Sequence, residues 1–393
     1  MNSINKLEVE QQAVNNIIDA IRGCLIGGAA GDALGYPIEF LGEEEIFTRY
    51  TKEGIMAHVP AWNTGKTRIS DDTQMTLFTA NGLLNAETKL KRCELGVNPT
   101  ACVADAYLDW VRTQNMSYEK FIQWKNEDDT NHVYTWLSYV PELYQRRAPG
   151  TTCINELSIR GKHIKNLKAC NASKGCGGVM RVAPVGLWKN NEDIKTLDRL
   201  GADIAEITHA HSLGYMTAAV MVHIINRIVF PISKRLPLKE IVAEAVDTVA
   251  ELYEGDIHLQ ELTSMIKLSM KLSENDDSDL ENIHRIGGGW VAEETLGIAI
   301  YCALRHQDDF SKGIIAAVNH DGDSDSTGAV TGNILGAWAG YKGIDEKWKK
   351  DLELADVILE MADDICKGCQ MVEYEECSGP DWIRKYVSCK WKE

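Results

Sequence analysis

Glycines recur every fourth residue in two segments that lie at opposite ends of this chain. The two sets are Gly23, Gly27, Gly31 and Gly35, and Gly328, Gly332, Gly336 and Gly340. A glycine in a helix interior costs about 1 kcal/mol relative to alanine, so four on one helix face need a physical reason. Such a face allows another helix to approach closely. We expect both segments to be tightly packed central helices, with mutual packing as one way to achieve this; chance in a chain with 32 glycines is the alternative.

The rest of the chain also shows helical periodicity, and convincing alternating strands are scarce. The clearest helical stretches are residues 13–34, 72–84, 100–113, 198–227, 238–253, 259–272, 291–304 and 326–341. The nine prolines mostly fall between these stretches. This pattern predicts an all-α protein.

Composition narrows the classes of function. The formal charge of −17 argues against a nucleic-acid partner, which requires a basic surface. The sequence contains no run of about 18 apolar residues, so we expect no membrane span. The polar first sixteen residues do not resemble a signal peptide. Eleven scattered cysteines argue for reduced thiols, although Cys366 and Cys369 leave a weak zinc alternative. We expect a cytoplasmic protein that acts away from membranes.

Two acidic clusters each precede a helical stretch. The first is Ser70-Asp71-Asp72-Thr73, and the second runs from Asp321 to Thr327 with the sequence DGDSDST. One explanation is helix capping, in which a hydroxyl or carboxylate accepts bonds from the first backbone N–H groups. Capping needs only one such residue, however, and adjacent carboxylates repel each other unless a cation lies between them.

Oxygen ligands of this kind suit Mg²⁺, Mn²⁺ or Ca²⁺ better than zinc. The second cluster is not an EF-hand loop, because Ser326 replaces the glycine at loop position six and no glutamate occupies position twelve. Two such clusters together could enclose two cations about 3.5–4 Å apart, as in metallohydrolases. Metal binding and capping therefore both remain open from these residues alone.

Five motifs, taken in order, resemble the ADP-ribosylglycohydrolase family. They are Gly27–Phe40 (GGAAGDALGYPIEF), Arg68–Thr73 (RISDDT), Ser173–Pro184 (SKGCGGVMRVAP), Thr208–Tyr215 (THAHSLGY) and Gly322–Gly328 (GDSDSTG). The resemblance spans about residues 20 to 345. We therefore expect an N-terminal extension (1–18), a compact multi-helix ADP-ribosylglycohydrolase-like domain (19–345), and a helical, cysteine-containing C-terminal extension (346–393) packed on that domain.

The resemblance implies a central binuclear metal site that holds two Mg²⁺ or Mn²⁺ ions. The residues that match the family's ligand motifs are Ser70, Asp71, Asp72, Asp323, Asp325 and Ser326. Many members have threonine at both hydroxyl positions, and serine retains the ligand oxygen. Asp321 lies outside the ligand pattern, which indicates a solvated or supporting acid.

The resemblance also implies catalytic and substrate-binding residues. Glu39 matches the acid that these enzymes place beside the attacking water, although alone it would be taken for a surface residue. The residues that match substrate contacts are Ser173, Lys174, Gly175, Gly177, Gly178, His209 and Trp290. The glycines can form an anion nest for a diphosphate, and a tryptophan can stack on adenine.

The resemblance implies a metal-dependent hydrolase that removes ADP-ribose from protein side chains by attack of water at the anomeric carbon of the distal ribose. The serines in RISDDT and GDSDST favour arginine-linked substrates. The alternatives are hydrolysis of serine-linked or free O-linked ADP-ribose, or a non-catalytic protein that binds ADP-ribose or a toxin. The partner is an ADP-ribosylated protein, with an ADP-ribosyltransferase toxin or a regulatory transferase as the functional counterpart.

Overall fold

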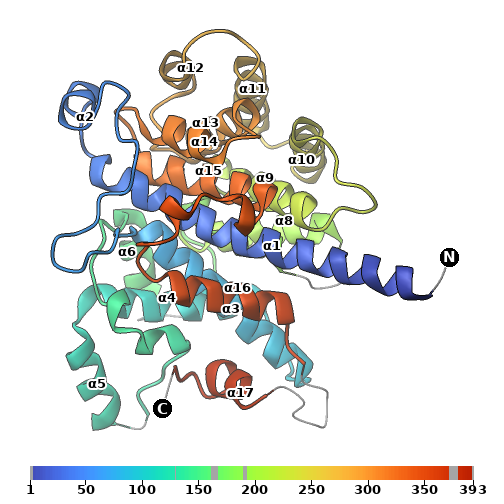
Figure 1. Ribbon diagram of the computed structural model, residues 1–393. Helices are drawn as coiled ribbons and strands as arrows, with labels where there is room; N and C mark the ends of the chain where they lie inside the picture. The colour runs from blue at the N-terminus through green and yellow to red at the C-terminus, as the bar shows by residue number, and fades with distance from the viewer. Residues whose placement is uncertain (1–2, 129, 161–166, 189–192, 371–378, 392–393) are drawn as a thin grey trace.

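A computed structural model describes residues 3–128, 130–160, 167–188, 193–370 and 379–391 (Figure 1). Within these ranges the protein is helical and contains no β-strand, which confirms the predicted all-α fold. Two isolated backbone bridges, between Thr67 and Leu352 and between Gly175 and Val291, are the only strand-like pairings in the described residues.

The described residues form α-helices that are joined by loops and short 3₁₀-helices. The α-helices are α1 (Ser3–Gly35), α2 (Glu43–Arg49), α3 (Asp71–Lys91), α4 (Pro99–Asn115), α5 (Tyr118–Glu127), α6 (Thr151–Arg160), α7 (Ala183–Leu187), α8 (Ile194–Glu206), α9 (Ser212–Val229), α10 (Leu238–Leu252), α11 (Leu259–Leu272), α12 (Asp279–Ile286), α13 (Ala292–Arg305), α14 (Phe310–Val318), α15 (Ser324–Ala339), α16 (Ala355–Lys367) and α17 (Pro380–Tyr386). The 3₁₀-helices are η1 (Tyr36–Ile38), η2 (Trp136–Tyr139), η3 (Pro141–Leu143), η4 (Cys176–Gly178), η5 (Tyr341–Gly343) and η6 (Glu346–Trp348).

The predicted single helix over residues 198–227 is wrong, because the chain breaks between α8 and α9. The backbone N–H of Ala210 leaves the helical pattern and donates to Asn171 Oδ1 at 3.2 Å. His211 then caps α9, with its Nδ1 accepting from the Leu213 N–H at 3.2 Å. This break turns the THAH segment toward the centre of the molecule.

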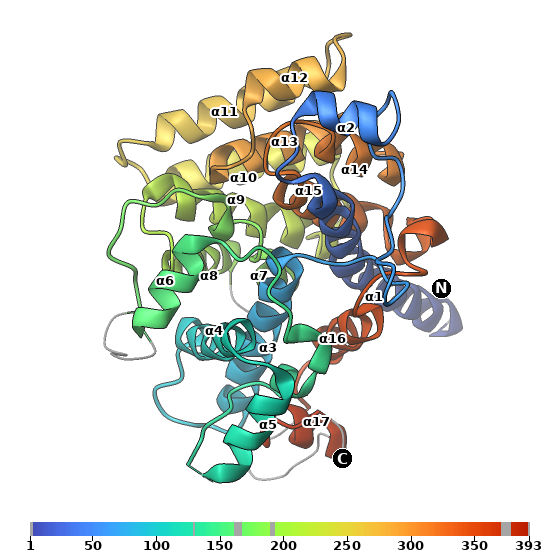
Figure 2. The ribbon, with the colours of Figure 1, turned by 90° about the vertical axis from the view of Figure 1, so that its left-hand side faces the viewer.

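The two glycine-rich helices, α1 and α15, pack against each other more extensively than any other pair of described elements, and they lie side by side in both ribbon views (Figures 1 and 2). A Cβ atom at Gly23 would lie 2.2 Å from the Gly336 carbonyl oxygen, and one at Gly31 would lie 1.9 Å from that of Gly328. No side chain fits at these distances. The prediction of central, tightly packed helices is confirmed, and the helices pack on each other.

The register of this packing is antiparallel and positions the acidic residues. Gly23 faces Gly336, whereas Gly35 at the other end of α1 faces Ser324, whose carbonyl oxygen would lie 2.2 Å from a Cβ atom at Gly35. The C-terminal end of α1 therefore lies beside the N-terminal end of α15. The segment after Gly35, which carries Glu39, consequently meets the second acidic cluster.

We expect Gly31→Ala to destabilise the fold. In a helix interior, alanine is more favourable than glycine by about 1 kcal/mol. At this position, however, its methyl group would collide with the backbone of Gly328. Overpacking typically costs about 1–3 kcal/mol, and more where the obstacle is backbone. Chemical denaturation should show a net loss of at least about 1 kcal/mol in the free energy of unfolding. Gly42→Ala is the control, since a Cβ atom there meets no atom within 4 Å. Equal stability of both variants would contradict this packing.

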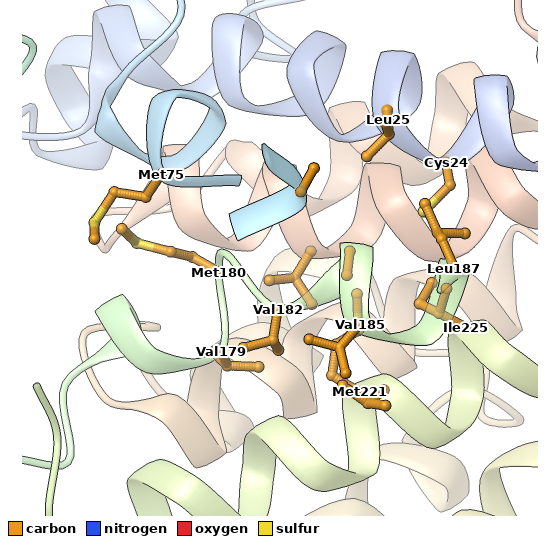
Figure 3. Close-up of a cluster of buried hydrophobic side chains, with 14 of the residues drawn as sticks. Cys24, Leu25, Met75, Val179, Met180, Val182, Val185, Leu187, Met221 and Ile225 are labelled. Atoms are coloured by element: carbon orange, nitrogen blue, oxygen red, sulfur yellow. The ribbon is translucent and has the colours of Figure 1, made fainter. Parts of the chain in front are cut away.

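A buried apolar layer lies below the two central helices. Figure 3 shows Met75 and Met180 next to each other, with Val185 and Met221 farther along the same layer. Helix α9 belongs to this interior. It has the length and apolar composition of a membrane span, but 83% of it is buried inside the protein, which is typical of the core helix of a globular protein.

The C-terminal part of the described chain packs onto the same helices. Residues 3–18 form the beginning of α1, and α16 packs against α1 and α3. Arg22 on α1 makes a bidentate ion pair with Asp363 on α16, with bonds of 2.6 and 2.8 Å. The division into a central domain (19–345) with extensions at 1–18 and 346–393 stays a prediction.

Candidate functional site

A cavity of about 190 Å³ lies where the two acidic clusters meet. Its walls come from the segment after α1, the N-terminal ends of α3 and α15, the loop that leads into α6, and the glycine-rich segment at η4. The predicted site residues that line it are Glu39, Asp71, Asp72, Gly175, Gly177, His209, Trp290, Asp323, Asp325 and Ser326. Segments separated by almost 300 residues thus contribute to one site.

At the start of α3, one residue of the first cluster performs the capping. Ser70 is the N-cap, and its Oγ accepts from the Asp72 N–H at 3.1 Å. Asp71 Oδ2 accepts from the Gly150 N–H at 3.2 Å. Asp72 Oδ2 is buried without a hydrogen-bond partner. Capping therefore explains Ser70 and leaves the buried carboxylate of Asp72 unexplained.

The start of α15 repeats this arrangement. Asp323 is the N-cap residue and accepts from the Ser326 N–H at 3.4 Å, and Asp325 Oδ1 accepts from the same N–H at 3.0 Å. Only 3% of Asp323, 3% of Asp325 and 1% of Ser326 is exposed. The second cluster therefore brings two buried carboxylates to one helix end.

Glu39 completes the acidic centre. It follows η1, is only 8% exposed, and has one carboxylate oxygen, Oε2, without a hydrogen-bond partner. Carboxylate oxygens of Glu39, Asp323 and Asp325 all lie within 4.8 Å of one another. The acidic residues next to Glu39 in the sequence suggest a surface position. The antiparallel packing of α1 and α15 instead places Glu39 in this centre.

The acidic centre is electrostatically unfavourable without a cation. Burial, followed by the negative charges of Asp323 and Asp71, raises the pKa of Glu39 to about 8. Burial is also the main cause that raises the pKa of Asp71 to about 8. The pKa values of Asp72 and Asp325 lie well above the usual range for the same reasons, burial followed by neighbouring carboxylates. Buried, partnerless and mutually repelling oxygens fit divalent, oxygen-preferring cations.

Asp32 is a further buried acid that sequence analysis did not assign to the site. It lies on α1 among the glycines and is completely buried. Its carboxylate accepts from the backbone N–H of Ser70 at 2.9 Å, from that of Thr73 at 3.1 Å, and from the Thr73 hydroxyl. Asp32 therefore fixes the first cluster to α1. A carboxylate in the otherwise apolar, glycine-rich second half of α1 (residues 23–35) was the available signal.

We expect Asp32→Asn to destabilise the protein by about 1.5–3 kcal/mol, the usual contribution of hydrogen bonds to a charged group. The amide places an N–H group against donors that need an acceptor. Thermal unfolding, with Asp247→Asn on the exposed face of α10 as the control, measures the difference. A substitution at such an exposed position usually changes the free energy of unfolding by less than about 0.5 kcal/mol. An Asp32→Asn variant that matched this control would contradict the anchoring role.

A second support comes from residues beyond the predicted central domain. Glu353 Oε2 accepts from the Ile69 N–H at 3.2 Å, and its Oε1 pairs with Arg147 at 2.7 Å. Arg147 in turn accepts, through its carbonyl oxygen, from the Asp71 N–H at 3.1 Å. The segment before α16 therefore helps to orient the first acidic cluster, a link between distant residues that no local motif reveals.

The glycine-rich segment contributes only part of its predicted residues to the cavity. Gly175 and Gly177 line it, and a Cβ atom at Gly177 would lie 2.9 Å from both Cys153 Sγ and His209 Cε1. Gly178 faces Ala205 and Gly214 instead.

Ser173 and Lys174 lie beside the cavity. Ser173 Oγ is 3.3 Å from the hydroxyl of Thr152. The Lys174 ammonium group is ion-paired with the buried Glu293 and lies 3.6 Å from Glu261. The predicted substrate contacts of Ser173, Lys174 and Gly178 stay predictions.

His209 is buried at the cavity wall as a neutral imidazole. Burial, followed by the charge of Arg181, lowers its pKa to about 3. The Thr208 hydroxyl lies 2.8 Å from His209 Nδ1 and also accepts from Arg181 at 2.7 Å. Arg181 is completely buried behind this wall and has no carboxylate within ion-pair distance among the described residues. Its charge makes this side of the cavity positive, opposite the carboxylates.

Trp290 stands at the mouth of the cavity. Its ring is stacked on that of Phe40, with centroids 6.0 Å apart and planes inclined by 24°. Trp290 is 45% exposed and Phe40 is 73% exposed. An exposed aromatic pair next to a polar cavity offers a surface for a flat ring. Phe40, adjacent to Glu39, was not predicted to contribute.

Asp321 lies outside the cavity, as its position in the motif predicted. One of its carboxylate oxygens lies within 4.8 Å of ligand atoms of Glu43 and His284. Glu43 and His284 form an ion pair with each other. His284 and Asp321 are exposed, and this surface group is explained as a set of solvated charges.

The fold and the site together define an all-helical protein with a cavity that has buried carboxylates on one side and the buried Arg181 behind the other. The sequence profile of the ADP-ribosylglycohydrolase family matches residues 13–375. This chain therefore belongs to the ADP-ribosylglycohydrolase family, whose members are generally metal-dependent, and family membership supports ADP-ribose hydrolase activity.

Individual relatives agree with this placement. An uncharacterized protein of Archaeoglobus fulgidus is 25% identical over 347 residues, which cover 88% of this chain and 95% of that protein. The ADP-ribosylhydrolase ARH3 of Mus musculus is 24% identical over 366 residues (86% and 88%), and the ADP-ribosylarginine hydrolase Tri1 of Serratia proteamaculans is 22% identical over 356 residues (88% and 79%).

A solved structure shows the same fold. It is described as an ADP-ribosylglycohydrolase-related protein complex and superposes with a TM-score of 0.58 at 22% identity. The match covers 90% of this chain and 99% of that one.

Proposed function

We propose that this protein is a metal-dependent hydrolase that removes ADP-ribose from modified arginine side chains of proteins. The observation that supports it most is the centre of buried carboxylates around Glu39, in which Glu39 Oε2 and Asp72 Oδ2 have no partner. A structural role gives no reason to bury partnerless carboxylates. The residues proposed to hold two divalent cations, Mg²⁺ or Mn²⁺, are Ser70, Asp71, Asp72, Asp323, Asp325 and Ser326.

The proposed ions would supply charge stabilisation and orient the hydroxyl groups of the distal ribose. The other half of the cavity suits the remainder of the substrate. Gly175 and Gly177 line the cavity without side chains, so a diphosphate is proposed to approach their backbone there. Buried Arg181 provides a favourable potential for that anion through the Thr208–His209 wall. The exposed ring of Trp290 at the mouth is proposed to receive the adenine.

Glu39 is proposed to act as the general base. It lies in the centre with one unpaired oxygen, and its raised pKa reflects a carboxylate that gains from accepting a proton. The oxygen of a water molecule bonds to the anomeric carbon while the bond from that carbon to the guanidine nitrogen breaks. Glu39 takes a proton from the water, and the departing guanidine gains one to leave as guanidinium. Arginine and free ADP-ribose are the products.

The preference for arginine rests on the serine-containing motifs at Ser70 and Ser326 and on a relative that is named for arginine hydrolysis. Turnover of matched peptides carrying ADP-ribose on arginine or on serine tests it. We expect at least about tenfold faster release from the arginine peptide, which corresponds to about 1.4 kcal/mol in transition-state binding. Faster release from the serine peptide would assign the protein to O-linked substrates.

A further inference from the structure

Cys176 places a sulfur atom at the edge of the acidic centre. Its Sγ donates to Asp323 Oδ2 at 2.8 Å, and the residue lines the same cavity. Its backbone holds it there, because the Cys176 N–H donates to the Trp290 carbonyl oxygen at 3.3 Å. The adjacent Gly175 pairs antiparallel with Val291. The thiol is therefore fixed beside a carboxylate oxygen of the cluster.

The atoms around this thiol require a partner of positive charge. Glu39 Oε2 and Asp72 Oδ2 belong to residues more than nine-tenths buried, line the same cavity, and have no hydrogen-bond partner. Oxygens of Glu39, Asp323 and Asp325 lie within 4.8 Å of one another. The sulfur of Cys176 thus meets this set of carboxylates at Asp323.

Sulfur changes which cation such a set prefers. Mg²⁺ and Mn²⁺ favour oxygen ligands, whereas a thiolate favours softer ions. Zinc binds sulfur at about 2.3 Å and carboxylate oxygen at about 2.0–2.2 Å. A sulfur and an oxygen 2.8 Å apart can both reach one ion at those lengths, with an angle of about 80° between the two bonds. Rotation of the thiol widens this angle without moving the backbone.

We propose that Cys176 and Asp323, beside the carboxylates of Glu39 and Asp325, bind a thiophilic divalent cation such as Zn²⁺ or Cd²⁺ that competes with the hard cations. On binding, the Cys176 thiol releases its proton to solvent and its sulfur bonds to the ion. This ion would use Asp323, which is also proposed to hold the hard cations, so the two kinds of ion exclude each other. The thiophilic ion therefore inhibits. This inference rests on the proposed cation site but not on hydrolysis of an ADP-ribose bond.

Cys153 provides an internal contrast, because it lines the same cavity without meeting these conditions. Its Sγ lies 3.3 Å from a guanidinium nitrogen of Arg181. A cation at that sulfur would be repelled by the guanidinium charge. Two thiols of one cavity thus differ in their charged neighbour, and of the two only Cys176 is bonded to a carboxylate.

The experiment uses the full chain freed of metal by chelation and titrated with Cd²⁺ alone. Binding to sulfur is followed by the ultraviolet sulfur-to-cadmium charge-transfer absorption in wild type, Cys176→Ser and the control Cys153→Ser. The difference in absorption between wild type and Cys176→Ser reports Cd²⁺ bound at this site, because the other cysteines are the same in both proteins. Circular dichroism verifies folding, and Cys176→Ala replaces the serine variant if that variant is unfolded.

We expect wild type and Cys153→Ser to absorb more strongly with Cd²⁺ than Cys176→Ser does. Added Mn²⁺ should remove this difference. Removing a residue that only hydrogen-bonds to a metal ligand usually weakens metal binding by about 10–100-fold. Removing the ligand sulfur itself should therefore weaken Cd²⁺ binding at this site at least about tenfold. Full absorption in Cys176→Ser, or absorption that excess Mn²⁺ leaves unchanged, would overturn the proposal. A normal cadmium result without any ADP-ribose release would retain this site and reject the hydrolase instead.

Discussion

Asp325→Ala should abolish metal-dependent turnover. Asp325 is one of three carboxylates whose oxygens lie within 4.8 Å of one another, and it is buried at the end of α15. A cation contributes several kcal/mol to stabilising the charge that develops in hydrolysis. Each 1.4 kcal/mol is a factor of ten in rate, so we expect a loss of at least about 10²–10³-fold in release of ADP-ribose.

The same variant should lose its response to added metal. A ligand present at one hundred times its dissociation constant stabilises the folded state by about 2.7 kcal/mol. Mg²⁺ or Mn²⁺ should therefore raise the unfolding temperature of wild type and leave that of Asp325→Ala nearly unchanged. Without metal, the variant should be at least as stable as wild type, because one of the mutually repelling buried carboxylates has gone.

Asp321→Ala is the matched control, since Asp321 belongs to the same loop and is exposed. It should retain both activity and metal stabilisation. Wild-type turnover by Asp325→Ala in the presence of chelator would refute the assignment of this cluster as the cation site. Equal losses in both variants would indicate damage to the loop instead.

Glu39→Gln should separate catalysis from binding. Glutamine preserves the shape of the side chain and its hydrogen bonding but cannot accept a proton from water. We expect kcat to fall by roughly 10²–10⁴-fold, the usual contribution of a general base. The affinity for ADP-ribose should stay close to that of wild type, so the loss appears in kcat.

Calorimetric titration with ADP-ribose beside a release assay measures both quantities. Glu44→Gln is the control, because Glu44 is an exposed glutamate at the start of α2. Unchanged turnover in Glu39→Gln would show that Glu39 is not the general base. Lost ADP-ribose binding would make it a ligand or structural residue instead.

The sequence predicted the central part of the fold because its signal is local and periodic. Glycine at every fourth position identifies a helix face that must meet another backbone, and the structure shows Gly31 against Gly328. The helical stretches were predicted on the same basis. The break between α8 and α9 was missed because apolar spacing continues across it, and only the bond from Ala210 to Asn171 reveals it.

The candidate site was predictable to the extent that each acidic cluster is contiguous in the chain. The meeting of the two clusters with Glu39 depends on helix register. Asp32 and Glu353 were missed because they act through backbone N–H groups of a distant segment. The ion pair between Lys174 and Glu293 likewise joins residues more than one hundred positions apart. Such partners are defined by the three-dimensional packing, and one sequence contains no local pattern that identifies them.

The most direct test of the central claim is the release of ADP-ribose from a protein modified on arginine. The full chain is incubated with this substrate in Mg²⁺ or Mn²⁺, in chelator, and in chelator followed by excess metal. The account predicts release with either metal, loss of release in chelator and recovery on restoring metal. No release under any condition, or equal release with and without chelator, would contradict it.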